Sequence, residues 1–135
     1  MAIKISTVMR NANADAFARQ HDNGYWRIYS GSRPANPQTA ITGTLLAEGR
    51  FSATSAAAAS NGTITWSTVA DSAADATGAA THFRTFKSDG TTVGYDGDVS
   101  DSAGSGDLKL TQTGNTNITT GQPVSISSWT FTVPE

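Results

Sequence analysis

The sequence predicts a mainly β fold, an antiparallel β-sandwich or barrel-like domain preceded by one short N-terminal helix. Two patterns lead to this prediction. Short runs of β-branched and aromatic residues recur with turn signals about every ten residues, as in sandwiches and barrels. The first twenty residues differ from the rest, because their apolar residues recur at the three- and four-residue spacing of a helix.

Composition agrees with this fold class and narrows the function. Charged residues make up 15% of the 135 residues, against a usual fraction of roughly 25%. The formal net charge of −2 offers no electrostatic surface for nucleic acid or an anionic membrane. Without cysteine, the chain can form neither disulfides nor thiolate zinc sites. Because no apolar run is long enough for a membrane span or a secretory signal, we expect neither.

Residues 1–20 are expected to form the helix, with Ser6 or Thr7 as its N-cap and its end near Gln20. Its apolar stripe consists of Ile5, Val8, Met9, Ala12 and Ala16. This stripe could be buried on the chain's own β domain or on a neighbouring subunit. The alanines supply little core volume and permit close approach, so we favour an attachment segment that docks on a neighbour.

Residues 24–135 are expected to form the β domain, so that 1–135 is a single domain. Strands are predicted at 25–29, 45–51, 63–69, 79–87, 91–95, 108–110 and 123–133. Asn61-Gly62 and Asp89-Gly90 predict tight turns, and a loop rich in glycine and aspartate is expected at 96–106.

The last predicted strand changes its apolar parity after Ile126, which predicts a β-bulge near Ser127-Ser128. The predicted core consists of Ile28, Leu46, Phe51, Ile64, Phe83, Leu108, Leu110, Ile126 and Phe131.

The segment 32–44 is expected to be an ordered loop that contacts a partner. Pro34 and Pro37 stiffen it, so that little entropy is lost when a partner orders it. Arg33 would be its polar anchor. The candidate partner-binding residues are therefore Ile5, Val8 and Met9 of the helix with Arg33, Pro34 and Pro37 of the loop.

No catalytic, cofactor or metal residues are predicted. His21 and His82 are the only histidines, and no nucleophile elbow or phosphate-binding loop is present. Five aspartates between residues 89 and 107 could offer oxygen ligands to calcium, but they do not match a calcium loop and are better explained as turn residues. They are Asp89, Asp96, Asp98, Asp101 and Asp107.

Aromatic residues are expected mostly in the core, although one or two exposed ones would suffice to bind a sugar or a subunit. The candidates are Trp26, Trp66, Trp129, Tyr25, Tyr29 and Tyr95.

Three stretches resemble a family of small virion structural proteins of tailed phages and prophages. They are RIYSGSRP at 27–34, TLLAE at 44–48 and FKSDGTT at 86–92, and the similarity spans 10–131. The resemblance implies a virion location and partners such as the major capsid protein or other virion proteins. Homo-oligomers are expected, because small interfaces repeated in many copies suit a capsid decoration protein. A tail or collar component and a host-glycan-binding module are the alternatives, and an enzyme comes last.

Overall fold

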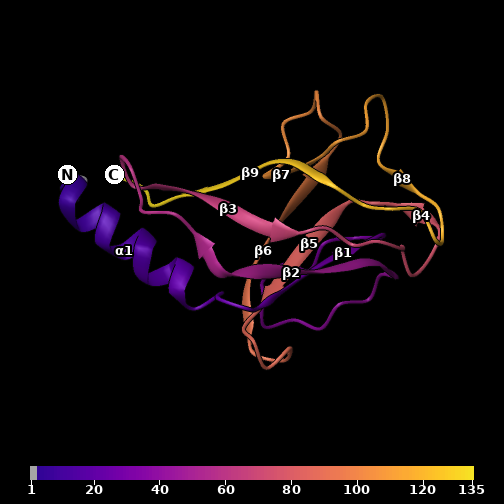
Figure 1. The fold of residues 1–135 in the computed structure, drawn as a ribbon, viewed down its shortest axis with the longest axis horizontal. Helices are drawn as coiled ribbons and strands as arrows, with labels where there is room; N and C mark the ends of the chain where they lie inside the picture. Colours follow the sequence, from indigo (N-terminus) through magenta and orange to yellow (C-terminus); the bar gives the residue numbers. More distant parts are fainter. Residues whose placement is uncertain (1–2) are drawn as a thin grey trace.

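Seven strands close into a barrel in the computed structural model, which describes residues 3–135 except for the side chain of Val69 (Figure 1). In order around the barrel the strands are β1 (Tyr25–Tyr29), β2 (Leu45–Ala56), β3 (Thr63–Val69), β9 (Ile126–Thr132), β7 (Leu108–Leu110), β6 (Val93–Ser100) and β5 (His82–Phe86). The helix α1 (Thr7–Arg19) lies at one end, and the small sheet of β4 (Gly78–Ala79) and β8 (Asn117–Ile118) at the other. The mainly β, barrel-like fold class is confirmed.

Neighbouring strands of the barrel are antiparallel, except for β6 and β7, which run parallel. The expected turns are present: Asn61 and Gly62 have φ angles of 51° and 75°, and Gly90 has a φ of 72°. These left-handed conformations are the reason that Asn-Gly and Asp-Gly sequences suit tight hairpins.

The predicted β-bulge in the last strand is confirmed. Lys109 is paired with Ser128, whereas Leu110 is paired with Ile126, so that Ser127 is the extra residue. The Ser127 hydroxyl lies 3.2 Å from the Lys109 carbonyl oxygen and 3.1 Å from that of Leu110. The bulge thus turns the side chains that follow it back towards the barrel interior.

The prediction of a loop over 96–106 is wrong at its start, because β6 continues to Ser100. Asp96 lies in this part of β6, where it forms a buried ion pair with Arg84. Gly97 lies against the ring of Phe83, and a Cβ at this position would be 2.4 Å from that ring. Both residues therefore belong to a packed strand, although aspartate and glycine are typical turn residues and had predicted a loop.

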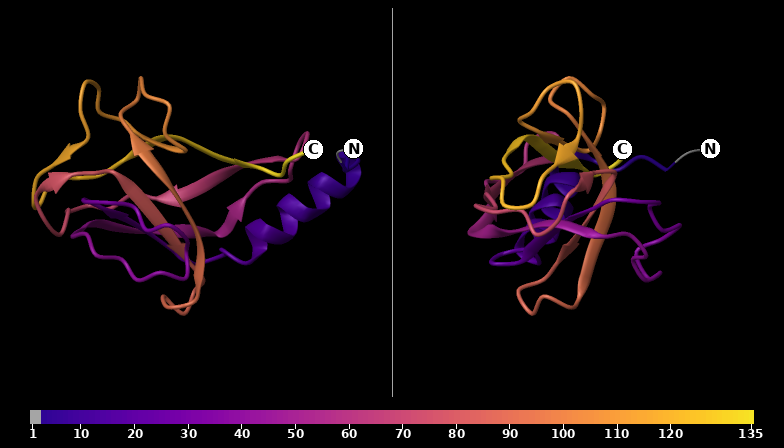
Figure 2. Two further views of the ribbon diagram at one scale, coloured as in Figure 1. Left: turned by 180° about the vertical axis from the view of Figure 1, so that it is seen from behind. Right: turned by 90° about the vertical axis from the view of Figure 1, so that its right-hand side faces the viewer.

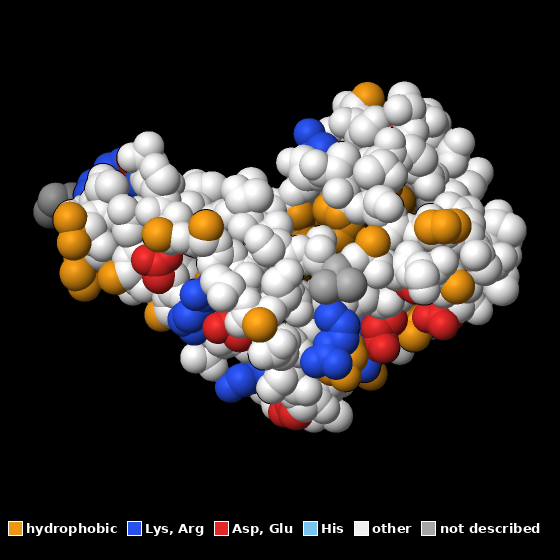
Figure 3. Space-filling view, viewed as in Figure 1, with side chains coloured by type: hydrophobic (Ala, Val, Ile, Leu, Met, Phe, Trp, Pro, Cys, Tyr) orange, Lys and Arg blue, Asp and Glu red, His pale blue; other side chains and the backbone are white. Residues whose placement is uncertain are grey.

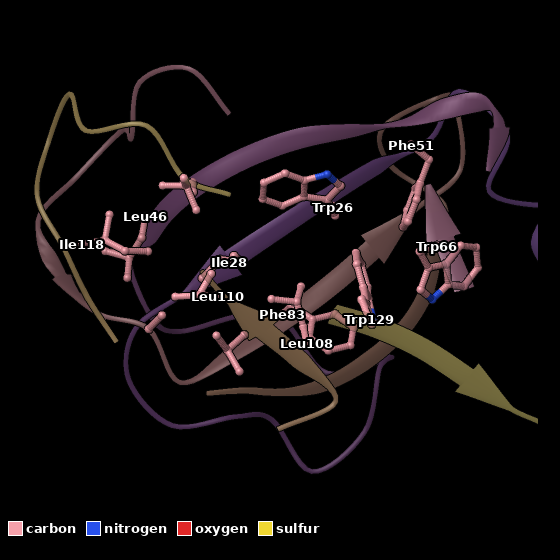
Figure 4. Close-up of a cluster of buried hydrophobic side chains, with 14 of the residues drawn as sticks. Trp26, Ile28, Leu46, Phe51, Trp66, Phe83, Leu108, Leu110, Ile118 and Trp129 are labelled. Atoms are coloured by element: carbon pink, nitrogen blue, oxygen red, sulfur yellow. The ribbon is translucent and has the colours of Figure 1, made fainter. Parts of the chain in front are cut away.

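The core fills the barrel with aromatic and aliphatic side chains (Figure 4). Of the predicted core residues, the buried ones are Ile28, Leu46, Phe51, Ile64, Phe83, Leu108 and Leu110. Ile126 and Phe131 are half-buried and pack against this core. The core also includes all three tryptophans, Trp26, Trp66 and Trp129.

The helix α1 begins after the N-cap Ser6, as predicted, and its C-cap is Gln20. Its barrel-facing side consists of Arg10, Ala14, Phe17 and Ala18. Ala14 and Ala18 are fully buried, and the Phe17 ring stacks on Phe131 with 4.2 Å between centroids. The Arg10 Nε donates a hydrogen bond to the Val133 carbonyl oxygen, at 3.0 Å. The helix thus packs on its own barrel, and Figure 2 shows that its N-terminal end lies beside the chain's C-terminus at one tip of the molecule.

Candidate functional site

The helix stripe, defined as Ile5, Val8, Met9, Ala12 and Ala16, is exposed along its whole length. Val8 is 76% exposed and Met9 is 56% exposed. Ile5, predicted to lie on the helix, instead precedes its first residue, Thr7, and is 38% exposed, and Ile3 before it is 87% exposed. Figure 3 shows hydrophobic side chains gathered at this free end of the molecule. Large apolar side chains with this exposure are costly in water and mark interaction surfaces when they cluster.

Two faces of one helix explain why the stripe is free. At 3.6 residues per turn, Arg10, Ala14 and Ala18 lie nearly opposite Val8, Met9 and the alanines of the stripe. The inner face is held by side-chain hydrogen bonds as well as by burial: the Asn11 and Asp15 side chains accept from the backbone of the β2–β3 turn, at 2.7 and 2.8 Å. The helix thus packs on the chain's own barrel, but through the face opposite the predicted stripe. Met1 and Ala2 lie outside the described residues.

The loop 32–44 lies along the outside of β5 and β6, and its residues are partly occupied within the chain. The Arg33 guanidinium binds the Asp98 carboxylate at 3.1 Å and the Asp96 carbonyl oxygen at 3.3 Å, although 42% of the side chain is exposed. Pro34 and Pro37 are half-buried. The expected polar anchor for a partner thus also fastens the loop to β6.

Beneath this loop lies a buried ion pair that the sequence did not reveal. Arg84 Nε and Nη2 bind the two carboxylate oxygens of Asp96 at 2.6 and 2.8 Å. The side chains are only 5% and 2% exposed. The remaining contact of the guanidinium is with the Asn36 carbonyl oxygen of the loop, at 3.4 Å. This bidentate geometry offsets the cost of removing two charges from water.

Of the other aspartates of the 89–107 region, Asp98 pairs with Arg33, Asp107 binds the backbone of β6, and Asp89 and Asp101 bind turns. Asp89, Asp101 and Asp107 each accept hydrogen bonds from main-chain N–H groups. Bonds from the Thr92 hydroxyl and from the Thr92 and Thr91 N–H groups lower the pKa of Asp89 to about 2. Within residues 3–135, no three side chains of the metal-binding types are grouped closely enough to hold an ion.

His21 and His82 are both buried: His82 is the first residue of β5, and His21 contacts Thr85 of the same strand. His21 Nδ1 donates to the Phe17 carbonyl oxygen at 3.0 Å, so its Nε2 accepts from the Thr85 hydroxyl at 2.9 Å. The Thr81 hydroxyl donates to the Gly31 carbonyl oxygen and thus accepts from His82 Nδ1 at 2.8 Å. Among residues 3–135, His82 Nε2 has no hydrogen-bond partner. Both contact patterns suit the neutral imidazole.

These histidines should make the fold weaker in acid. Burial lowers the pKa of His21 and of His82, whereas imidazole in the unfolded chain titrates near pH 6.5. Below about pH 6.5 the unfolded state therefore binds more protons than the folded state. The free energy of unfolding consequently decreases as the pH is lowered. We expect urea denaturation between about pH 7 and about pH 5 to show a fall of up to about 1.4 kcal/mol per pH unit for each histidine. In the His82→Gln variant the slope should be shallower, and an unchanged slope would contradict this assignment.

The aromatic residues build the core more than the surface. Trp26, Trp66, Trp129 and Tyr29 are buried, and Tyr95 accepts a hydrogen bond from Trp66 Nε1 at 3.0 Å. Tyr25 is half-buried on the barrel surface, where the Arg50 guanidinium lies 4.2 Å from its ring centroid. The tryptophans are thus unavailable as a sugar-stacking platform.

Comparisons with known proteins give no match: no family model, no curated protein and no solved structure is significantly similar to this chain. Within residues 3–135, no helix is long and apolar enough to cross a membrane.

Proposed function

We propose that this protein is a structural component of a tailed-phage virion, most specifically a decoration protein that binds the mature capsid in many copies. The observation that carries the proposal is the exposed helix stripe, a surface that faces away from a barrel already packed by the opposite side of the same helix. The resemblance of 27–34, 44–48 and 86–92 to small virion proteins supports the same class.

A stripe of this size suits an assembly with many copies. Burial of one Val or Met side chain contributes about 1.5–3 kcal/mol, so that one such contact is weak by itself. Repetition over a shell multiplies weak contacts through the high local concentration of neighbours. If the protein binds only the mature shell, each bound copy stabilises that state over its precursors.

Substitution of the stripe should separate assembly from folding. Because Val8 and Met9 are exposed, the double variant Val8→Asp/Met9→Asp should keep the melting temperature of the isolated protein to within a few degrees. Its incorporation into gradient-purified particles of the phage or prophage that encodes it should fall at least tenfold, as measured by quantitative mass spectrometry. Asn13→Asp adds a charge on the same helix, outside the stripe, and serves as the matched control with normal incorporation.

Two results would overturn the proposal. One is the absence of the unsubstituted protein from purified particles while it is abundant in the lysate. The other is normal incorporation of the double variant, which would remove the stripe from any role in attachment.

A further inference from the structure

We infer that the loop 32–44 is a strap that opens in acid, and that His82 beneath it is the group that responds to pH. The inference does not depend on the virion role, because it concerns the fold of the isolated chain. It rests on how the loop is fastened, on what it covers and on the charges around the covered imidazole.

The loop has the structure of a unit that can open without the barrel. Its ends meet where the Ser30 N–H donates to the Thr44 carbonyl oxygen, at 3.0 Å. Inside the loop, the Asn36 side chain accepts hydrogen bonds from the N–H groups of Gln38 and Thr39, both at 3.1 Å. None of the residues 32–44 is fully buried. Compact loops with adjoining ends and few buried contacts open at a lower free-energy cost than global unfolding.

The contacts between this loop and the barrel surround His82. The Thr81 hydroxyl donates to the carbonyl oxygen just before the loop, at 2.6 Å. Arg33 binds Asp98, which lies directly opposite His82 on β6. Arg84, two residues further along β5, donates to a carbonyl oxygen in the middle of the loop, at 3.4 Å. The loop therefore passes over His82 and is held there by polar contacts.

His82 points to the outer side of the barrel wall, yet it is fully buried. Side chains alternate along β5, so that Phe83 packs in the core whereas His82 and Arg84 face outward. The Tyr29 ring stacks on the imidazole, with 5.5 Å between centroids. Among residues 3–135, His82 Nε2 has no hydrogen-bond partner. Because the core lies on the other face of the strand, the cover that keeps water from this imidazole is the loop.

A proton on His82 would find no uncompensated negative charge. The charged groups around it are Asp96 and Asp98 of β6, Arg84 of β5 and Arg33 of the loop, and they already form two ion pairs. Burial is the main cause that lowers the pKa of His82; the two arginines lower it further and the two aspartates raise it. The tyrosine stacked on the ring stays neutral, since burial raises the pKa of its phenol.

Opening of the loop would return His82 to water, where imidazole takes up a proton near pH 6.5. Below about pH 6.5 the open state therefore binds more protons than the closed state. Its population should grow as the pH is lowered, by up to about tenfold per pH unit. Opening also separates Arg33 from Asp98, which makes Arg33, Pro34 and Pro37 available to a partner.

Hydrogen exchange of single amides, followed by NMR, measures this opening. The Ser30 N–H reports on the loop, because its bond closes the two ends, and the Phe51 N–H, bonded to the Gly24 carbonyl oxygen at 3.0 Å, reports on the barrel. After correction for the intrinsic rate at each pH, Ser30 should be at least tenfold less protected than Phe51 at pH 7. Between about pH 6.5 and pH 5, the protection of Ser30 should fall by up to about tenfold per pH unit.

Three variants separate the contributions of the groups. His82→Gln removes the titrating group and should make the protection of Ser30 nearly independent of pH. His21→Gln is the matched control, because His21 is also buried but contacts the helix and not the loop, and it should keep the slope. Asp98→Asn removes the exposed partner of Arg33, and should lower the protection of Ser30 at pH 7 by up to about fivefold without affecting Phe51.

An unchanged slope in His82→Gln, or equal protection of Ser30 and Phe51 at pH 7, would overturn the inference. If His82→Gln does not fold, NMR titration of the imidazole in the unsubstituted protein gives the answer. The expected result is a pKa of His82 below that of an unfolded peptide, together with loop protection that declines over the same pH range. A His82 that titrates in the folded protein as it does in a peptide would show that the loop does not shield it, and would refute the strap.

Discussion

Replacing Asp96 with asparagine is expected to destabilise the fold by about 3–5 kcal/mol, because the Arg84 guanidinium would remain buried without its counter-charge. The two carboxylate oxygens accept both guanidinium bonds at 2.6 and 2.8 Å, and neither side chain is more than 5% exposed. Denaturant titration at neutral pH measures the effect. Since total stability of a domain is about 5–15 kcal/mol, this one change could remove a large part of it.

Asp98→Asn is the matched control, because it makes the same chemical change two residues further along β6. Asp98 also pairs with an arginine, Arg33, but this pair is exposed, with 42% and 62% of the two side chains accessible. Exposed ion pairs contribute about 0–1 kcal/mol, so that Asp98→Asn should be almost neutral. Equal losses for the two variants would show that burial does not determine the strength of these pairs.

Phe83→Ala should cost about 3–5 kcal/mol, since it would leave a cavity at the centre of the aromatic core. The Phe83 side chain is fully buried and meets the rings of Trp129 and Tyr95 edge-on, at 4.8 and 5.3 Å between centroids. The backbone of Gly97 closes its remaining side. Thermal or urea unfolding followed by tryptophan fluorescence gives the change in stability.

Phe83→Leu retains most of the side-chain volume and is the control, with an expected loss below that of the alanine variant. A stability loss under about 1 kcal/mol for Phe83→Ala would mean that neighbouring side chains collapse into the space, and that the core is less tightly packed than the structure indicates.

Local sequence patterns predicted much of this fold because they act over few residues. Runs of aromatic and β-branched residues identified β1 and β3, Asn-Gly identified the turn before β3, and Asp-Gly identified the turn between β5 and β6. Even the bulge at Ser127 followed from the parity of the side chains around it. In each case the deciding interaction is between residues close in sequence or on the two faces of one strand.

The features that could not be predicted depend on residues far apart in the chain. From the sequence alone Asp96 is predicted to be a turn residue, because the pattern does not show that Arg84 pairs with it from the adjacent strand. On the helix, the apolar pattern pointed to the face of Val8 and Met9, whereas the face that packs on the barrel contains Arg10 and Ala14. The spacing of Ala14, Phe17 and Ala18 was a signal for the inner face, but the charged Arg10 on the same side obscured it. Its burial is explained by the Val133 carbonyl at the other end of the chain.

The position of β9 in the barrel has a consequence for synthesis of the chain. This strand is the last of the barrel in sequence, yet it lies between β3 and β7 and completes the ring of hydrogen bonds. Arg10 likewise finds its carbonyl partner 123 residues later. A nascent chain therefore leaves the ribosome tunnel with an open sheet and unpaired strand edges until residues up to 133 have emerged. The barrel can therefore close only after β9 has been made, and a chain released before this strand would be an aggregation-prone, protease-sensitive fragment.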